Sequence, residues 1–153
     1  MRLLYILVRT MKSTTKIKTY SELCKLETFE ERMRYLAIGD GIGEETFGSR
    51  RYLNQEFYRS AFWRRIRNHV IFRDDGCDLG ICTEPIYTRP LIHHMNPITI
   101  EDILERSPLA IDEEYLITVS FDTHNAIHYG DVDGYLLGRT PAIRTPNDMC
   151  PWK

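Results

Sequence analysis

Four of the five histidines fall in two clusters, and these clusters restrict the fold more than any other feature of the sequence. His93 and His94 end a run that is rich in β-branched and aromatic residues, whereas His124 and His128 lie in a predicted helix. Residues four apart on a helix share a face, so both imidazoles of the second cluster can converge on one ion. Neighbouring strand residues point to opposite sides, so one of His93 and His94 can bind metal while the other faces a substrate.

The order of the predicted elements around these clusters is strand, loop, strand, helix. The strands are predicted over residues 86–94 and 115–120, and the loop between them contains a short helix capped by Thr99. The helix that follows the second strand is predicted to begin at Asp122 or Thr123. Each histidine cluster alone has an ordinary explanation, since surface histidines and chance H-x-x-x-H spacings are common. Together, in this order, they predict a metal site.

Helices are also predicted before the histidine clusters. Residues 19–38 are predicted to be helical, because they contain two capping-box patterns, Thr19 with Glu22 and Thr28 with Glu31. A separate helix is predicted to be capped by Ser60 and to end at Asp75 and Gly76. The chain is therefore predicted to be one α+β domain over residues 19–138, with its catalytic core at about 86–130. Residues 1–18 are predicted to be a disordered extension, and residues 139–153 a proline-containing tail.

Charge is distributed unevenly although the formal net charge is only −2. Residues 50–73 carry seven arginines and one glutamate, a local charge of +6, and residues 101–133 carry nine acids and one arginine, a local charge of −8. The basic segment is predicted to contact phosphates, through the residues Arg59, Arg64, Arg65, Arg67 and Arg73. The alternative is a solvated helix face. Trp63 and Tyr58 are predicted to lie in the core.

Cysteine content and hydropathy indicate the compartment. Four scattered cysteines do not form a disulfide scaffold, which favours a reducing compartment such as the cytosol. The apolar stretch at the N-terminus is too short for a signal peptide or a membrane span, so we expect neither secretion nor a membrane partner.

The sequence resembles the HNH endonuclease superfamily, on the motifs FWRRIRNHVIFRDDGC, IHHMNPIT and EEYLITVSFDTHNAIHYG. The resemblance covers roughly residues 60–130. It implies a ββα-metal fold, in which a two-stranded antiparallel ribbon and a helix surround one divalent ion. The segments YSELCKLETFEERMRYL and RYLNQEFYRS further resemble the small HNH proteins of tailed bacteriophages. This narrower resemblance implies phage packaging proteins as partners and the cytoplasm of a bacterial host as the location.

Carried over to this sequence, the resemblance makes His94 the general base. It makes His93, His124 and His128 the ligands of one divalent ion, which is Mg²⁺, Zn²⁺, Mn²⁺ or Ni²⁺. The implied reaction is hydrolysis of DNA phosphodiester bonds by water, as a nick or a double-strand break. The alternative function is a non-catalytic DNA-binding or packaging-accessory protein that retains the fold. A third hypothesis is that the histidines hold a purely structural ion.

The chain departs from the family pattern at two places. Tyr115 stands where the middle asparagine of the family name usually lies, and Asn96 or Asn125 are candidates to brace the site instead. Many relatives also carry two cysteine pairs that hold a structural zinc ion, but here Ser120 and Thr123 occupy the positions of the second pair. Cys77 and Cys82 are therefore predicted to be ordinary thiols.

Overall fold

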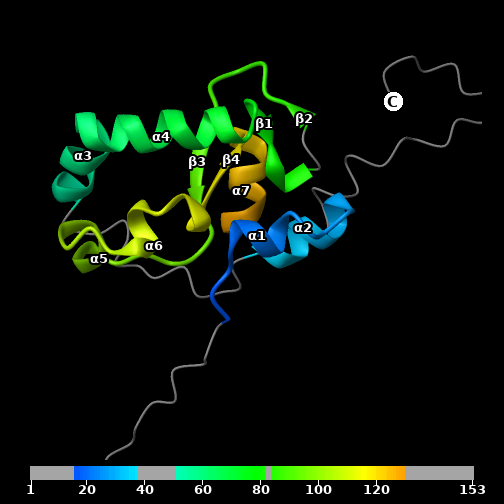
Figure 1. The fold of residues 1–153 in the computed structure, drawn as a ribbon, viewed down its shortest axis with the longest axis horizontal. Helices are drawn as coiled ribbons and strands as arrows, with labels where there is room; N and C mark the ends of the chain where they lie inside the picture. Colours follow the sequence, from blue (N-terminus) through cyan, green and yellow to red (C-terminus); the bar gives the residue numbers. More distant parts are fainter. Residues whose placement is uncertain (1–15, 38–50, 82–83, 130–153) are drawn as a thin grey trace, which may run out of the picture.

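A two-stranded antiparallel ribbon lies at the centre of the fold, with helices on both of its faces (Figure 1). The computed structural model describes residues 16–37, 51–81 and 84–129, which form a mixed α+β fold. The ribbon pairs β3 (Leu91–His94) with β4 (Leu116–Val119), and the helix α7 (Phe121–Tyr129) follows directly. The predicted order of strand, loop, strand and helix is thus confirmed as secondary structure.

The register of the ribbon assigns the two neighbouring histidines to opposite faces. His93 pairs with Ile117 on one face, and His94 pairs with Leu116 on the other. All four residues of β4 are buried, because helices cover both faces. The run LITV supplies three apolar side chains and Thr118, whose buried hydroxyl has no hydrogen-bond partner among the described residues.

The face that carries His93 packs on the larger core cluster. This cluster joins the ribbon to α7, to the helices α1 (Tyr20–Leu23) and α2 (Phe29–Leu36), and to the 3-10 turn η2 (Leu79–Ile81). Its buried members are Leu23, Met33, Leu36, Leu79, Ile81, Met95, Ile117, Val119, Ala126 and Ile127.

The face that carries His94 packs on the long helix α4 (Ala61–Arg73), which follows α3 (Arg51–Arg59). Trp63, Val70 and Leu116 form the buried centre of this second cluster. Ser60 caps α4 as predicted, because its hydroxyl accepts a hydrogen bond from the backbone N–H of Trp63 at 3.0 Å. Asp75 and Gly76 end the helix with φ of 53° and 66°.

A buried carboxylate ties the start of α7 to the turn after α4. Asp78 is 1% exposed and accepts hydrogen bonds from Ser120 N at 2.9 Å and from the hydroxyl of Thr123 at 2.6 Å. These hydrogen bonds connect the segment after α4 directly to the residues at the start of α7. Cys77 is a free thiol, and Cys82 lies outside the described residues.

The remaining elements are short. The strands β1 (Cys77–Asp78) and β2 (Glu84–Pro85) form a second antiparallel pair. The connection from β3 to β4 contains α5 (Ile100–Leu104), α6 (Pro108–Ile111) and the 3-10 turn η3 (Glu113–Tyr115). No helix among the described residues is both long and apolar enough to cross a membrane.

Several predicted boundaries were wrong. The first strand begins at Leu91 rather than Ile86, because Pro90 has no N–H for the ladder. The α7 helix begins at Phe121, since Ser120 is the residue whose hydroxyl accepts the N–H of Thr123. Residues 19–38, which were predicted to be helical with two capping boxes, form the two helices α1 and α2.

The N-terminal segment also differs from the prediction. Thr28 and Glu31 form the predicted capping box. Thr19 caps α1 as predicted, because its hydroxyl accepts the N–H of Glu22 at 3.2 Å, but its own N–H donates to the hydroxyl of Tyr35 instead of the Glu22 carboxylate. Lys18, assigned from sequence to the extension, lies within the fold, where its ammonium donates to the carbonyls of Leu36 and Ala37. The glycines at 39, 41 and 43, residues 1–15 and the tail at 139–153 lie outside the described residues.

Candidate metal centre

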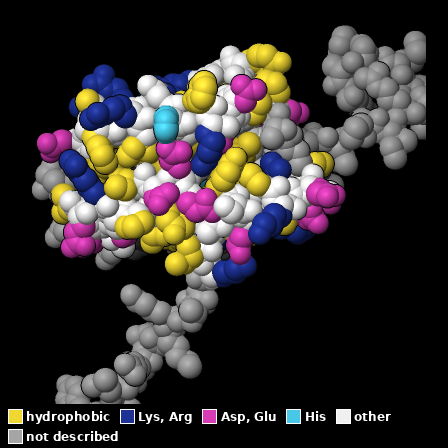
Figure 2. All heavy atoms as spheres, viewed as in Figure 1, with side chains coloured by type: hydrophobic (Ala, Val, Ile, Leu, Met, Phe, Trp, Pro, Cys, Tyr) yellow, Lys and Arg dark blue, Asp and Glu magenta, His cyan; other side chains and the backbone are white. Residues whose placement is uncertain are grey.

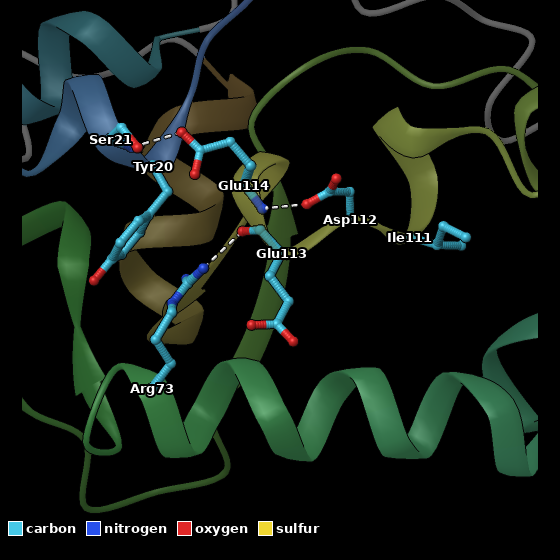
Figure 3. A pocket seen from close by; sticks show the side chains of 7 residues that line it. All are labelled: Tyr20, Ser21, Arg73, Ile111, Asp112, Glu113 and Glu114. Atoms are coloured by element: carbon cyan, nitrogen blue, oxygen red, sulfur yellow. Dashed lines mark hydrogen bonds between the residues drawn. The ribbon is translucent and has the colours of Figure 1, made fainter.

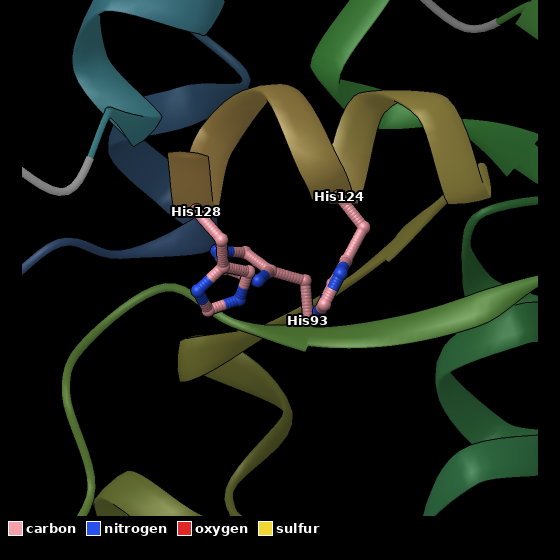
Figure 4. A group of neighbouring side chains, drawn as sticks. All are labelled: His93, His124 and His128. Carbon is pink, nitrogen blue, oxygen red and sulfur yellow. The ribbon is translucent and has the colours of Figure 1, made fainter. Parts of the chain in front are cut away.

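Three imidazoles meet between the ribbon and α7 (Figure 4). His93 reaches the group from β3, and His124 and His128 reach it from successive turns of α7. One nitrogen of each ring lies within 4.8 Å of the corresponding nitrogens of the other two, so the group could hold one metal ion. Nitrogen ligands at about 2.05 Å from a tetrahedral ion are roughly 3.4 Å apart, a separation within the limit that the three nitrogens satisfy.

The environment of His93 supports this interpretation. The residue is 1% exposed, and its Nε2 atom has no hydrogen-bond partner among the described residues. A buried polar nitrogen without a partner costs free energy, which a bound cation at this position would recover. His124 and His128 are partly exposed, so the remaining coordination positions of an ion face away from the core.

All three histidines are held in the neutral form that binds metal. Burial, and secondarily the charges of His128 and His124, lower the pKa of His93 well below its usual value. Burial, followed by the charge of His128, lowers the pKa of His124 to about 4, and burial lowers the pKa of His128. The cluster therefore presents free lone pairs at neutral pH without first losing protons.

His94 lies on the opposite face of the ribbon, as the alternation of a strand requires. Its ring stacks on Trp63 with centroids 5.5 Å apart and an interplanar angle of 12°. Its Nε2 lies 3.1 Å from the carbonyl oxygen of Ala110, which can only accept a hydrogen bond. The proton is therefore on Nε2, and Nδ1 keeps the lone pair. Burial lowers the pKa of His94 to about 4, partly opposed by the bond to Ala110.

The three predicted bracing residues have different environments. Tyr115 acts through its backbone, since its carbonyl accepts the N–H of Met95 at 3.0 Å and extends the ribbon pairing past His94. Asn96 is 7% exposed and exchanges two 2.8 Å hydrogen bonds with the backbone of Lys18, so it anchors the N-terminal segment. The side chain of Asn125 has no hydrogen-bond partner among the residues described.

The predicted basic face is only partly available to a ligand. Arg59, Arg64 and Arg65 are exposed, and basic side chains gather where α3 meets α4 (Figure 2). Arg67 is partly buried and donates to the carbonyl of Pro90 at 2.9 Å. Tyr58, expected in the core with Trp63, is 38% exposed, whereas Trp63 is 5% exposed as predicted.

Arg73 was predicted to contact phosphate but serves the fold. It pairs with Asp74 at 2.7 Å and donates to the carbonyls of Glu113 and Leu116 at 2.6 and 2.8 Å. Its guanidinium also lies 3.7 Å from the ring centroid of Tyr20. These contacts line a pocket that contains none of the histidines (Figure 3). Four of its five N–H donors are engaged within the fold, so Arg73 has little capacity left for a phosphate in this arrangement.

Two positioning groups were missed by the sequence analysis. The carbonyl of Ala110 fixes the tautomer of His94, and the carboxylate of Asp78 anchors the start of α7. Neither contact has a sequence signal, because each joins segments that lie far apart along the chain. No family model, curated protein or solved structure matches the chain.

Proposed function

We propose that the chain is a metal-dependent endonuclease of the HNH kind that hydrolyses phosphodiester bonds in DNA. The observation that carries the proposal is the convergence of His93, His124 and His128, with a buried and unpartnered Nε2 on His93. A fourth histidine, His94, is adjacent in sequence and has a lone pair free on Nδ1. Three ligands and a nearby base are the parts that metal-assisted hydrolysis needs.

The ligand set favours particular ions. His93, His124 and His128 would hold the ion through three neutral nitrogens, a donor set that suits Zn²⁺, Ni²⁺, Co²⁺ or Mn²⁺ better than Mg²⁺, which prefers oxygen. When bound, the ion would supply positive charge that stabilises the transition state of phosphodiester cleavage. No carboxylate belongs to the cluster within the described part of the chain.

His94 would accept the proton of the attacking water at Nδ1, while the carbonyl of Ala110 keeps Nε2–H in place. A pKa of about 4 makes the ring neutral but a weaker base than free imidazole. A phosphate anion beside the ring favours its protonated form and raises this pKa toward the range where general bases work well. Substrate binding would thus strengthen the base that the substrate needs.

The test is cleavage of supercoiled plasmid in the presence of Mg²⁺, Mn²⁺, Zn²⁺ or Ni²⁺, with a chelator control. We expect metal-dependent nicking by the wild type and a loss of at least about 100-fold in His94→Ala. His69→Ala is the matched control, because His69 is an exposed histidine of α4 that lies outside the cluster. Equal activity in His94→Ala and His69→Ala would contradict the role of His94.

One observation favours a second candidate, a DNA-binding accessory protein without catalysis. The ring of His94 is stacked on Trp63 and faces away from the three-histidine cluster. In that case the wild type would bind DNA but would leave plasmid intact with every ion, and His94→Ala would behave like the wild type.

A further inference from the structure

The segment between β2 and β3 passes beside α4 (Figure 1). Arg67 on α4 donates to the carbonyl of Pro90 at 2.9 Å, and Arg89 is the residue just before that proline. Arg64 lies one turn before Arg67, so the two side chains share a face of the helix. Arg67 and Arg89 come close enough for their charges to interact, and Arg64 shares the helix face of Arg67. We call these three residues the arginine row.

The charges of the arginine row are not neutralised within the fold. Neither Arg67 nor Arg89 forms an ion pair with a carboxylate in residues 16–37, 51–81 or 84–129. Burial, and after it the charge of Arg89, lowers the pKa of Arg67, which shows that the two cations repel each other. Holding like charges together costs free energy, and an anion placed between them would recover it.

The arginine row lies close to the histidine site. Pro90 immediately precedes β3, and His94 is the last residue of that strand. Four strand residues span about 13 Å, and one DNA strand advances about 3.4 Å along the helix axis per phosphate, so this distance would cover about four nucleotides of a duplex whose axis runs along β3. The segment is also accessible, because Tyr87 is 93% exposed.

We propose that Arg64, Arg67 and Arg89 form a second contact surface for duplex DNA, which holds the sugar–phosphate backbone about four nucleotides from the histidine site. The choice of DNA as the polyanion rests on the proposed function. Guanidinium groups bind phosphate through paired N–H donors, and backbone contacts of this kind fix the register of a duplex without reading its sequence. Arg89 is the member that the basic segment of residues 50–73 does not include.

The test is equilibrium binding of a labelled random-sequence duplex to the full chain, titrated with salt in the presence of a chelator. We expect Arg89→Ala to lower affinity about eightfold at 0.1 M salt and to make the slope of log affinity against log salt shallower by about 1. Arg89→Lys keeps the charge and should keep the slope. Lys25→Ala removes an exposed cation from the loop after α1, away from the row, and should also keep it.

The outcomes separate this inference from the proposed function. A slope that is unchanged in Arg89→Ala, or changed equally in Lys25→Ala, would overturn the inference even if the wild type cleaves plasmid. The absence of DNA binding by the wild type would also overturn it. If no ion supports cleavage but Arg89→Ala alone loses the salt-dependent contact, the arginine row stands and the nuclease proposal fails.

Discussion

At the scale of single residues, the site depends on two neighbouring histidines that face opposite sides of one strand. His93 turns into the core, where its Nε2 has no protein partner within the described chain. His94 turns toward α4, where the carbonyl of Ala110 determines which nitrogen carries the proton. The alternation of a strand thus gives adjacent, chemically identical side chains two separate environments.

Burial of neutral histidines predicts a pH dependence for the metal-free protein. The pKa values of His94 and His124 are lowered to about 4 in the folded state, while in the unfolded chain they return to about 6.5. The unfolded state therefore binds protons first, so stability falls as pH drops from about 6.5 to about 4. We expect the urea midpoint of the metal-free protein to decrease across this window.

The control for this prediction is His124→Ala, which removes one of the titrating groups. Its urea midpoint should fall less steeply than that of the wild type over the same pH range. Equal steepness in the two proteins would contradict the prediction, because His124 would then make no contribution to the acid response.

Residue identities alone predicted part of this site. The spacing of His124 and His128 was sufficient to place both on one helix face, and the structure confirms that they meet His93. The stacking of His94 on Trp63 could not be predicted, because it depends on how α4 crosses the ribbon. The contacts of Arg73 could not be predicted for a similar reason, since its partners Glu113 and Leu116 come from a distant segment.

At the scale of elements, the position of α7 depends on a close approach by η2. A Cβ atom on Gly80 would lie 2.5 Å from Cγ2 of Thr123, a distance that requires one of the two elements to move. We expect Gly80→Ala to cost about 1–3 kcal/mol in the free energy of unfolding, measured with urea. Metal affinity should fall with it, because α7 carries His124 and His128.

Two variants show whether the close approach is the cause. Gly76→Ala is the matched glycine control, since a Cβ there meets nothing within 4 Å and only the φ of +66° is strained, at about 1 kcal/mol. Thr123→Ser removes the methyl group but keeps the hydroxyl that Asp78 binds, so it should restore most of the stability lost in Gly80→Ala. The absence of rescue would mean that Thr123 is not the obstacle.

Element boundaries were predictable where a local signal sets them. Ser60, Thr28 and Thr99 each cap a helix through bonds to backbone groups within three residues. The two-residue strands β1 and β2 and the single turn of α6 were missed, because segments this short carry no periodic pattern. Contacts with neighbouring elements stabilise them, as in the pairing of β1 with β2.

At the scale of the whole molecule, we expect the apolar core to keep the fold without an ion. The larger core cluster joins α1, α2, η2, the ribbon and α7 through apolar side chains that are not metal ligands. We expect a chelator to leave most of the far-UV helix signal intact while it abolishes cleavage. Loss of the helix signal on chelation would indicate a structural ion instead.

The central claim is that three histidines bind one divalent ion, and a calorimetric titration with Ni²⁺ at neutral pH tests it most directly. We predict one ion per wild-type chain, loss of that binding in His124→Ala, and unchanged binding in the controls His69→Ala and His94→Ala. Absence of Ni²⁺ binding by the wild type, or equal binding by His124→Ala, would contradict it.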